Sequence, residues 1–305
     1  MSREREPDGR RPEPAATRPP AGGPVLPSLR FLCQSPLSAA GLVVVGLASA
    51  AALLAPWIAP YDPAAIDLAN TGLPPGGAHP LGTDDLGRDV ASRLLYGARV
   101  SLLVGVVATA VAAAIGTALG AAAGFFGGAV DLVLMRIADV IFAFPTALFA
   151  LAVLAVFEHP SVTLLFLVLG FIGWAGYARI ARAEILRLRE EPFAEAARAL
   201  GAGPARLLFR HLLPNGMAPI LVAVTSGVAG NILTESWLSF LGMGAQPPTP
   251  SWGMMITEGQ PYLTTRPWLC VFPGIAIAST VLGFNLLGDG LRDLLDPWLR
   301  RGGRA

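Results

Sequence analysis

The 305-residue sequence contains no lysine, so all 22 of its permanently basic residues are arginines. A phosphate-binding P-loop needs a lysine that reaches the β- and γ-phosphates of a nucleotide. The absence therefore excludes a P-loop on this chain. If ATP hydrolysis drives its activity, a partner chain must supply that hydrolysis.

Charged residues are scarce as well, at 14% of the chain, whereas 53% of the residues are hydrophobic. Soluble globular proteins carry about 25% charged residues. This composition argues against an ordinary soluble domain and indicates a membrane protein. The net charge of only +1 gives no information about partners, and we predict no nucleic-acid partner.

Cysteine and histidine are rare: the chain has Cys33, Cys270, His79, His159 and His211. The two cysteines lie far apart and form no CxxC or Cys/His spacing, so we predict neither a disulfide nor a metal site. The histidines fall in different loops and join no Ser/His/Asp set. The sequence therefore predicts no catalytic residues and disfavours a membrane-embedded hydrolase.

The sequence is rich in long apolar stretches. A helix needs about 20 apolar residues to cross a bilayer core, and the stretches show no polar–apolar alternation of the kind that transmembrane β-strands have. We therefore predict an all-α integral membrane protein with six transmembrane helices. The stretches run roughly over 37–58, 98–126, 132–157, 161–178, 217–241 and 268–288.

The N-terminal part has two possible interpretations. Residues 1–30, rich in Arg, Pro, Glu and Gly, are expected to form a disordered tail. Ala48-Ser49-Ala50 resembles a signal-peptide cleavage site, but the long polar leader and the later spans favour an uncleaved anchor. We divide the rest into a first transmembrane helix with an extracytoplasmic segment, 31–96, and a core domain of five transmembrane helices, 97–301.

Arginine placement predicts the topology, because cytoplasmic loops carry an excess of basic residues. If the N-terminus is inside, only four arginines fall on the outer side: Arg88, Arg93, Arg99 and Arg266. We therefore predict a multi-pass plasma-membrane protein with both termini in the cytoplasm.

Small residues recur in the second stretch, where they predict close helix packing; an Ala/Gly-biased composition is the alternative explanation. The residues are Gly105, Gly116, Gly120 and Gly124.

The segment from Glu190 to Asn215 is predicted to form two short helices joined by a tight turn. Pro192 suits the first turn of a helix, where its missing N–H is no loss. Gly201 suits the left-handed position that closes a helix. Pro204 then opens the second helix and Pro214 ends it.

Both short helices carry apolar stripes at three- and four-residue spacing. Such helices can lie in a groove of another protein, rest on the membrane surface, or pack on their own bundle. The pattern alone leaves these alternatives open. The stripes consist of Phe193, Ala196, Ala197 and Leu200, and of Leu207, Leu208 and Leu212.

The same segment resembles the EAA signature of permease subunits of ABC importers. The matching residues are Glu195, Ala196, Ala197, Gly201, His211, Leu213 and Pro214. The resemblance implies that the 191–215 loop is a cytoplasmic coupling helix pair that docks in a cleft on an ATPase subunit. His211 stands where the signature has an apolar residue, and this resembles the peptide-permease branch.

Three further blocks resemble the C-type permease of the dipeptide/oligopeptide family: 79–101, 238–253 and 283–297. The resemblance implies a type I ABC importer permease fold in a bacterial inner membrane. It also implies a second related permease, two ATPases that bind ATP and Mg²⁺, and an extracytoplasmic substrate-binding protein. This chain itself would bind no cofactor.

The cargo implied by the resemblance is a di- or oligopeptide, or a related solute such as a nickel complex, glutathione or a sugar. The alternative function is a subunit of an ion-gradient-driven secondary transporter. The absence of an internal inverted repeat speaks against it, because such repeats are common in that class.

Charged residues in or near the apolar stretches are candidates for function. Arg136 and Asp139 share a helix face, and we interpret them as a structural ion pair. Glu235 either faces the translocation pathway or hydrogen-bonds another helix. Residues 83–89 lack the spacing of a calcium loop, and Thr83 or Asp84 is predicted to cap the helix that enters the second span.

Overall fold

The computed structural model describes residues 35–157 and 161–295. The tail predicted at 1–30 and the end of the core domain after residue 295 lie outside the described residues. Within them the chain is helical with no β-strand, apart from two isolated bridges, Gly76 with His79 and Thr83 with Asp89. This confirms the all-α class.

The helices follow one another along the chain, and long connections occur at 59–89, which contains η1, and at 241–251. They are α2 (Pro36–Ile58), η1 (Leu68–Asn70), α3 (Val90–Phe126), α4 (Gly128–Phe142), α5 (Thr146–Leu154), α6 (Val162–Leu188), α7 (Pro192–Ala199), α8 (Pro204–Arg206), the π-helical η2 (Leu207–Leu212), α9 (Leu213–Asn215), α10 (Met217–Phe240), α11 (Trp252–Gly259), η3 (Gln260–Tyr262) and α12 (Trp268–Leu295).

Five of these helices, α2, α3, α6, α10 and α12, are long and apolar enough to cross a membrane. The pair α4–α5 makes a sixth span only if it is counted as one unit, because its two halves are bent by 84°. The span predicted over 132–157 is therefore broken into two helices. Pro145 explains the break, since it lacks an N–H and disfavours helical backbone at the residue before it.

Helix α3 begins at Val90, eight residues before the predicted start of the second span at 98. The side chain of Asp89 caps it by accepting a 2.7 Å hydrogen bond from the Ser92 N–H. The expectation that Thr83 or Asp84 caps this helix is therefore wrong. At 37 residues and about 1.5 Å per residue, α3 is about 55 Å long and runs without a break through the predicted domain boundary at 96/97.

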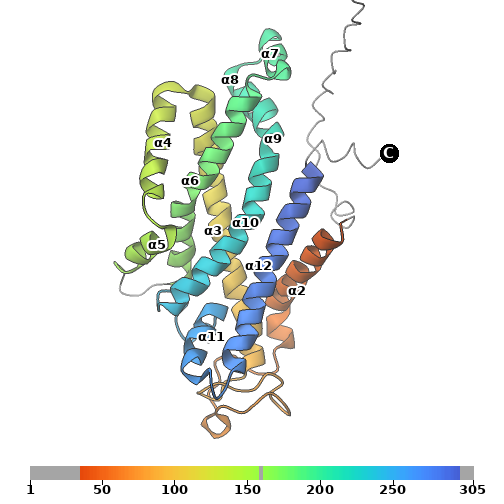
Figure 1. Cartoon of the computed structure of the whole chain (residues 1–305), viewed down its shortest axis with the longest axis vertical. Helices are drawn as coiled ribbons and strands as arrows, with labels where there is room; N and C mark the ends of the chain where they lie inside the picture. Colours follow the sequence, from red (N-terminus) through yellow and green to blue (C-terminus); the bar gives the residue numbers. More distant parts are fainter. Residues whose placement is uncertain (1–34, 158–160, 296–305) are drawn as a thin grey trace, which may run out of the picture.

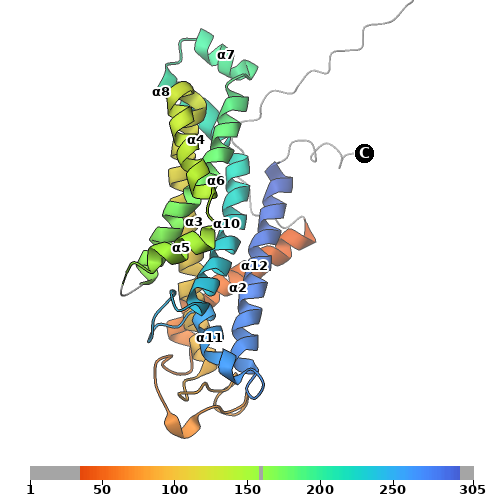
Figure 2. The same cartoon turned by 60° about the vertical axis from the view of Figure 1, so that its left-hand side comes forward.

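The helices form an elongated bundle in which α3 and α6 lie side by side (Figures 1 and 2). Their close approach depends on glycine: a Cβ added at Gly120 would overlap the carbonyl oxygen of Ala178, and one at Gly116 that of Trp174. A second close contact joins α2 to α12, where a Cβ at Gly41 would lie 2.8 Å from the Gly283 oxygen. These small residues therefore allow the helices to pack closely.

The two ends of the bundle differ. One end carries α7, α8 and α9, and we name it the α7 end; the opposite end carries α11 and the loops of residues 59–89, and we name it the α11 end (Figure 1). The α7 end has its own apolar core, whose residues come from α3, α6, α7 and η2.

Candidate functional site

The α7 end is built on a sharp turn after α6. Pro192 occupies the first turn of α7, as predicted. Gly201 has a φ of +81°, its N–H donates to the Arg198 carbonyl over 2.9 Å, and the Ala202 N–H donates to the Ala197 carbonyl over 3.0 Å. These paired bonds form a Schellman motif, which needs a left-handed residue at Gly201. The turn predicted at this glycine is confirmed.

The second helix opens at Pro204 as predicted, but Pro214 does not end it. The chain stays helical through Asn215 and turns only at Gly216. A proline inside an α-helix clashes with the carbonyl four residues before it. The wide π-helical turn Leu207–Leu212 lies directly ahead of Pro214 and gives that carbonyl more room.

The apolar stripe of the second short helix packs on the hydrophobic core at the α7 end of the same chain. Leu207, Leu208 and Leu212 are buried against α3, α6 and Ala194 of α7. Of the alternatives left open by the pattern, packing on its own bundle is therefore correct for this stripe. Its leucines are not free to enter a groove of another protein.

Two other large apolar side chains are exposed at the α7 end. Leu200 is 89% exposed and Phe209 is 69% exposed. The sequence pattern did not select Phe209, because it lies off the stripe of η2. The local signal at Phe209 is an aromatic residue flanked by Arg206 and Arg210, and single exposed apolar residues of this kind are common on protein surfaces.

The residues that match the EAA signature fall into two groups. Glu195, Ala196 and Gly201 are exposed on the α7 side, and Ala197 is half-buried. His211, Leu213 and Pro214 are half-buried where η2 and α9 join α10.

At the α7 end, some charged side chains have partners within the described residues and others have none. Arg198 donates to the Arg189 carbonyl over 3.1 Å, and Arg189 donates to the Gly124 carbonyl over 3.3 Å, which ties α7 to α6 and α3. Within residues 35–157 and 161–295, no group hydrogen-bonds or pairs with the side chain of Glu195, Arg206 or Arg210. These three charges remain available to a partner.

Arg136 and Asp139 approach to 3.9 Å on α4, so the predicted pair is a loose one. Asp139 has a closer partner on α6, Arg179, at 2.6 Å, and the Arg179 guanidinium lies over the ring of Phe142. This partner is 40 residues away in sequence, which is why helix-face reasoning within α4 could not find it.

A second pair joins α4 to α6, between Asp131 and both nitrogens of the Arg182 fork, one of them at 2.6 Å. Ala138 is the one buried residue of α4. The two interhelical ion pairs are thus the main polar links that hold α4 to the bundle.

Glu235 is fully buried in α10. Its carboxylate accepts hydrogen bonds from Ser239, over 2.7 Å, and from Ser101 of α3, over 3.1 Å. Of the two interpretations of Glu235, hydrogen bonding to another helix is the one that the geometry shows. The carboxylate reaches no surface of the chain.

Comparison with known proteins decides the family. Residues 116–301 match the family described as "Binding-protein-dependent transport system inner membrane component", which is more than half of the chain. Residues 28–75 match the "N-terminal TM domain of oligopeptide transport permease C". The chain belongs to the binding-protein-dependent transport permeases.

Several permeases are similar over nearly their whole length. The oligopeptide transport system permease protein OppC of Bacillus subtilis (strain 168) is 41% identical over 273 residues, which cover 90% of this chain and 89% of that protein. The dipeptide transport system permease protein DppC of Escherichia coli (strain K12) is 47% identical over 267 residues, 86% and 89% of the two chains. The glutathione transport system permease protein GsiD of Escherichia coli O6:K15:H31 is 44% identical over 272 residues, 89% of each.

These matches confirm the resemblance to dipeptide/oligopeptide ABC permeases and the function of a transmembrane transport subunit. The chain is a multi-pass permease of the inner membrane, and its family works with a binding protein. No group of three or more metal-binding side chains occurs in the described part of this permease.

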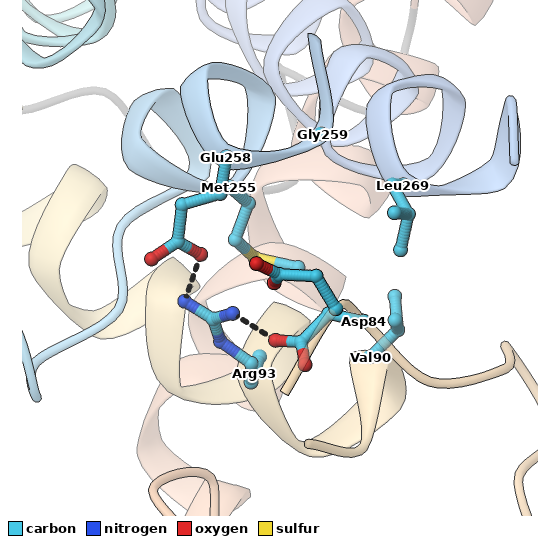
Figure 3. A pocket seen from close by; sticks show the side chains of 8 residues that line it. Asp84, Val90, Arg93, Met255, Glu258, Gly259 and Leu269 are labelled. Atoms are coloured by element: carbon cyan, nitrogen blue, oxygen red, sulfur yellow. Dashed lines mark hydrogen bonds and ion pairs between the residues drawn. The ribbon is translucent and has the colours of Figure 1, made fainter. Parts of the chain in front are cut away.

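The α11 end of the permease holds a buried charge cluster that sequence reasoning missed. Arg93, in the first turn of α3, lies between Asp84 and Glu258, as Figure 3 shows. Its Nη2 is 2.7 Å from Glu258 Oε2, as an ion pair rather than a well-aligned hydrogen bond. Arg88 also contacts both carboxylates, at 2.7 Å to Asp84 and 3.1 Å to Glu258.

Proposed function

We propose that this permease forms half of the translocation pathway of an ATP-driven importer and that the α7 end receives the ATPase. The observation that carries the proposal is the pair of exposed side chains Leu200 and Phe209 on a support that is itself buried. Apolar side chains bordered by polar and charged groups are typical of protein interfaces, and Glu195, Arg206 and Arg210 supply such charges here.

The buried core under α7 explains how a movement of α7 could be transmitted to the membrane-spanning helices. Only three residues, 189–191, separate α6 from α7, and Leu207, Leu208 and Leu212 pack the second helix onto the same core. Movement of the ATPase would therefore shift α6 and, through its glycine contacts, α3. Rocking of one bundle against another is how alternating access is achieved in many transporters.

The assembly follows from the same proposal. A second, related permease would complete the pathway, two ATPase subunits would bind ATP and Mg²⁺, and an extracytoplasmic binding protein would deliver the solute. This chain would then bind no cofactor and catalyse no reaction. The α7 end and both termini would be cytoplasmic, a placement that the arginine distribution supports.

The proposed cargo is a di- or oligopeptide, or a related small solute such as a nickel complex, glutathione or a sugar. The names of the similar permeases, which include oligopeptide, dipeptide and glutathione systems, support this range.

The test is uptake into vesicles that contain the whole complex, with labelled dipeptides, glutathione and nickel as probes. We expect uptake to require ATP on the side of the vesicle membrane where the ATPase subunits lie. Uptake that persists without ATP but stops when the ion gradient is dissipated would instead establish the secondary-transporter alternative.

Two substitutions test the docking site. Glu195→Arg reverses a free charge, and Gly201→Pro is incompatible with the left-handed turn because proline fixes φ near −65°. Both should abolish ATPase association while the permease still inserts. The matched control is Asp62→Arg, the same charge reversal at the exposed α11 end, which should leave association unchanged. Normal association in both loop variants contradicts docking at this site.

A further inference from the structure

Two chains of hydrogen bonds lead from the first turn of α11 to the carboxylate of Glu235. In one chain, the Trp252 N–H donates to Ser101 Oγ over 3.3 Å, and Ser101 donates to Glu235 Oε2. A serine hydroxyl has one proton and can accept two hydrogen bonds. The direction of this chain is therefore consistent at each step. Glu235 Oε2 also lies 3.5 Å from the Ser236 hydroxyl.

The second chain is longer. The Met254 N–H donates to Ser251 Oγ over 3.2 Å, Ser251 lies 3.4 Å from Ser239, and Ser239 donates to Glu235 Oε1 over 2.7 Å. Because the Ser239 proton is used on the carboxylate, Ser251 must be the donor between the two hydroxyls. Both oxygens of Glu235 thus receive a chain that starts at a backbone N–H of α11.

The first turn of α11 also lies tightly against its neighbours. A Cβ added at Gly253 would be 2.6 Å from Ser236 Cα of α10. The indole of Trp252 donates to the Leu94 carbonyl of α3 over 3.0 Å. There is no room for α11 to slide along α10 without opening these contacts.

The last turn of α11 is held by a different interaction. Glu258 pairs with Arg93 and Arg88, next to the start of α3 (Figure 3). Both ends of this eight-residue helix are therefore fastened to the same neighbour, α3, and the first end to α10 as well.

We propose that Glu235 is a positioning residue for transport: through Ser101 and Ser239 it fixes α11 to α3 and α10, so that the three helices move as one body when the permease changes state. This inference rests on the proposed import function. It assigns Glu235 a role in the movement of the half-pathway and not in contact with the solute.

Hydrogen–deuterium exchange of the assembled complex measures the fastening directly. We expect Glu235→Gln to speed exchange of residues 251–259 about tenfold, the change that accompanies loss of one buried hydrogen bond of about 1.4 kcal/mol. Ser101→Ala should have the same effect and can decide the question if Glu235→Gln fails to insert. The control is Ser279→Ala, whose hydroxyl donates to the Ala276 carbonyl of the same helix, α12, over 3.2 Å.

The second readout is ATP-driven uptake by the same complexes. We expect lower uptake in Glu235→Gln and Ser101→Ala with assembly and basal ATP hydrolysis unchanged, and no effect of Ser279→Ala. The inference is overturned if exchange over 251–259 does not change, if it rises equally throughout the chain, or if uptake is normal although α11 is loosened. Failure of the wild-type complex to need ATP would refute the proposed function alone, because exchange reports the fastening separately.

Discussion

Leu200 and Leu212 are leucines of one short segment with opposite surroundings. Leu200 is 89% exposed, whereas Leu212 is fully buried in the core of the α7 end. Substitution of each by alanine removes the same atoms from the two sides of the segment. The pair therefore separates docking from folding.

Leu212→Ala should destabilise the permease by about 2–5 kcal/mol, because it removes buried apolar contacts and leaves a cavity. Thermal unfolding of the purified permease in detergent measures this loss. Leu200→Ala should leave the unfolding midpoint unchanged, since its side chain makes little contact within the chain.

Leu200→Ala should instead weaken association with the ATPase. Burial of a leucine side chain contributes about 1.5–3 kcal/mol, which corresponds to a roughly 10- to 100-fold increase in Kd. Titration of ATPase subunits onto the permease complex in nanodiscs measures this change. The reasoning is refuted if Leu200→Ala binds the ATPase like the wild type, or if it lowers the unfolding midpoint as much as Leu212→Ala does.

Two further substitutions test the packing and the charge cluster. Gly120→Leu should destabilise the bundle by more than about 3 kcal/mol, as severe overpacking does, because its side chain would meet the Ala178 carbonyl. Gly176→Leu on α6, where an added Cβ meets no atom within 4 Å, should be tolerated, and thermal unfolding of both variants measures the difference. Arg93→Ala should lower the unfolding free energy by about 1.5–3 kcal/mol, because it removes charge-assisted contacts to Asp84 and Glu258 while Arg88 still pairs with both. Arg99→Ala, at an exposed position, should change thermal unfolding little, and equal effects of the two substitutions would contradict a structural role of the cluster.

Local sequence signals were sufficient wherever the physical cause was local. Long apolar stretches predict helices because backbone groups in lipid must be hydrogen-bonded within the segment. Gly201 and Pro192 identify the ends of α7 because each has a backbone conformation suited to its position. The break before α5 was also readable, since Pro145 stands in the middle of the third stretch, but hydropathy alone passes over it.

For the N-terminal cap of α3, local sequence signals led to a wrong prediction. Asp84 and Asp89 are both acidic residues that precede a helix, and sequence alone ranks the earlier one as well as the later one. In the structure, the Asp84 carboxylate forms ion pairs with Arg88 and Arg93. Asp89, which directly precedes α3, accepts the hydrogen bond from the Ser92 N–H.

The sequence by itself determined that this protein is a helical membrane protein with a tight two-helix turn in 190–215, because composition, hydropathy and turn residues are properties of the chain alone. That it is a permease followed from the resemblance of its motifs to a known family, which the comparisons confirmed. Only the tertiary structure decided which apolar side chains of that turn remain exposed and which partners Glu235 and Arg93 have. Glu235 meets Ser101, and Arg93 meets Glu258, across more than 130 residues of chain. Burial and pairing at such separations depend on how helices pack, and no local pattern encodes them.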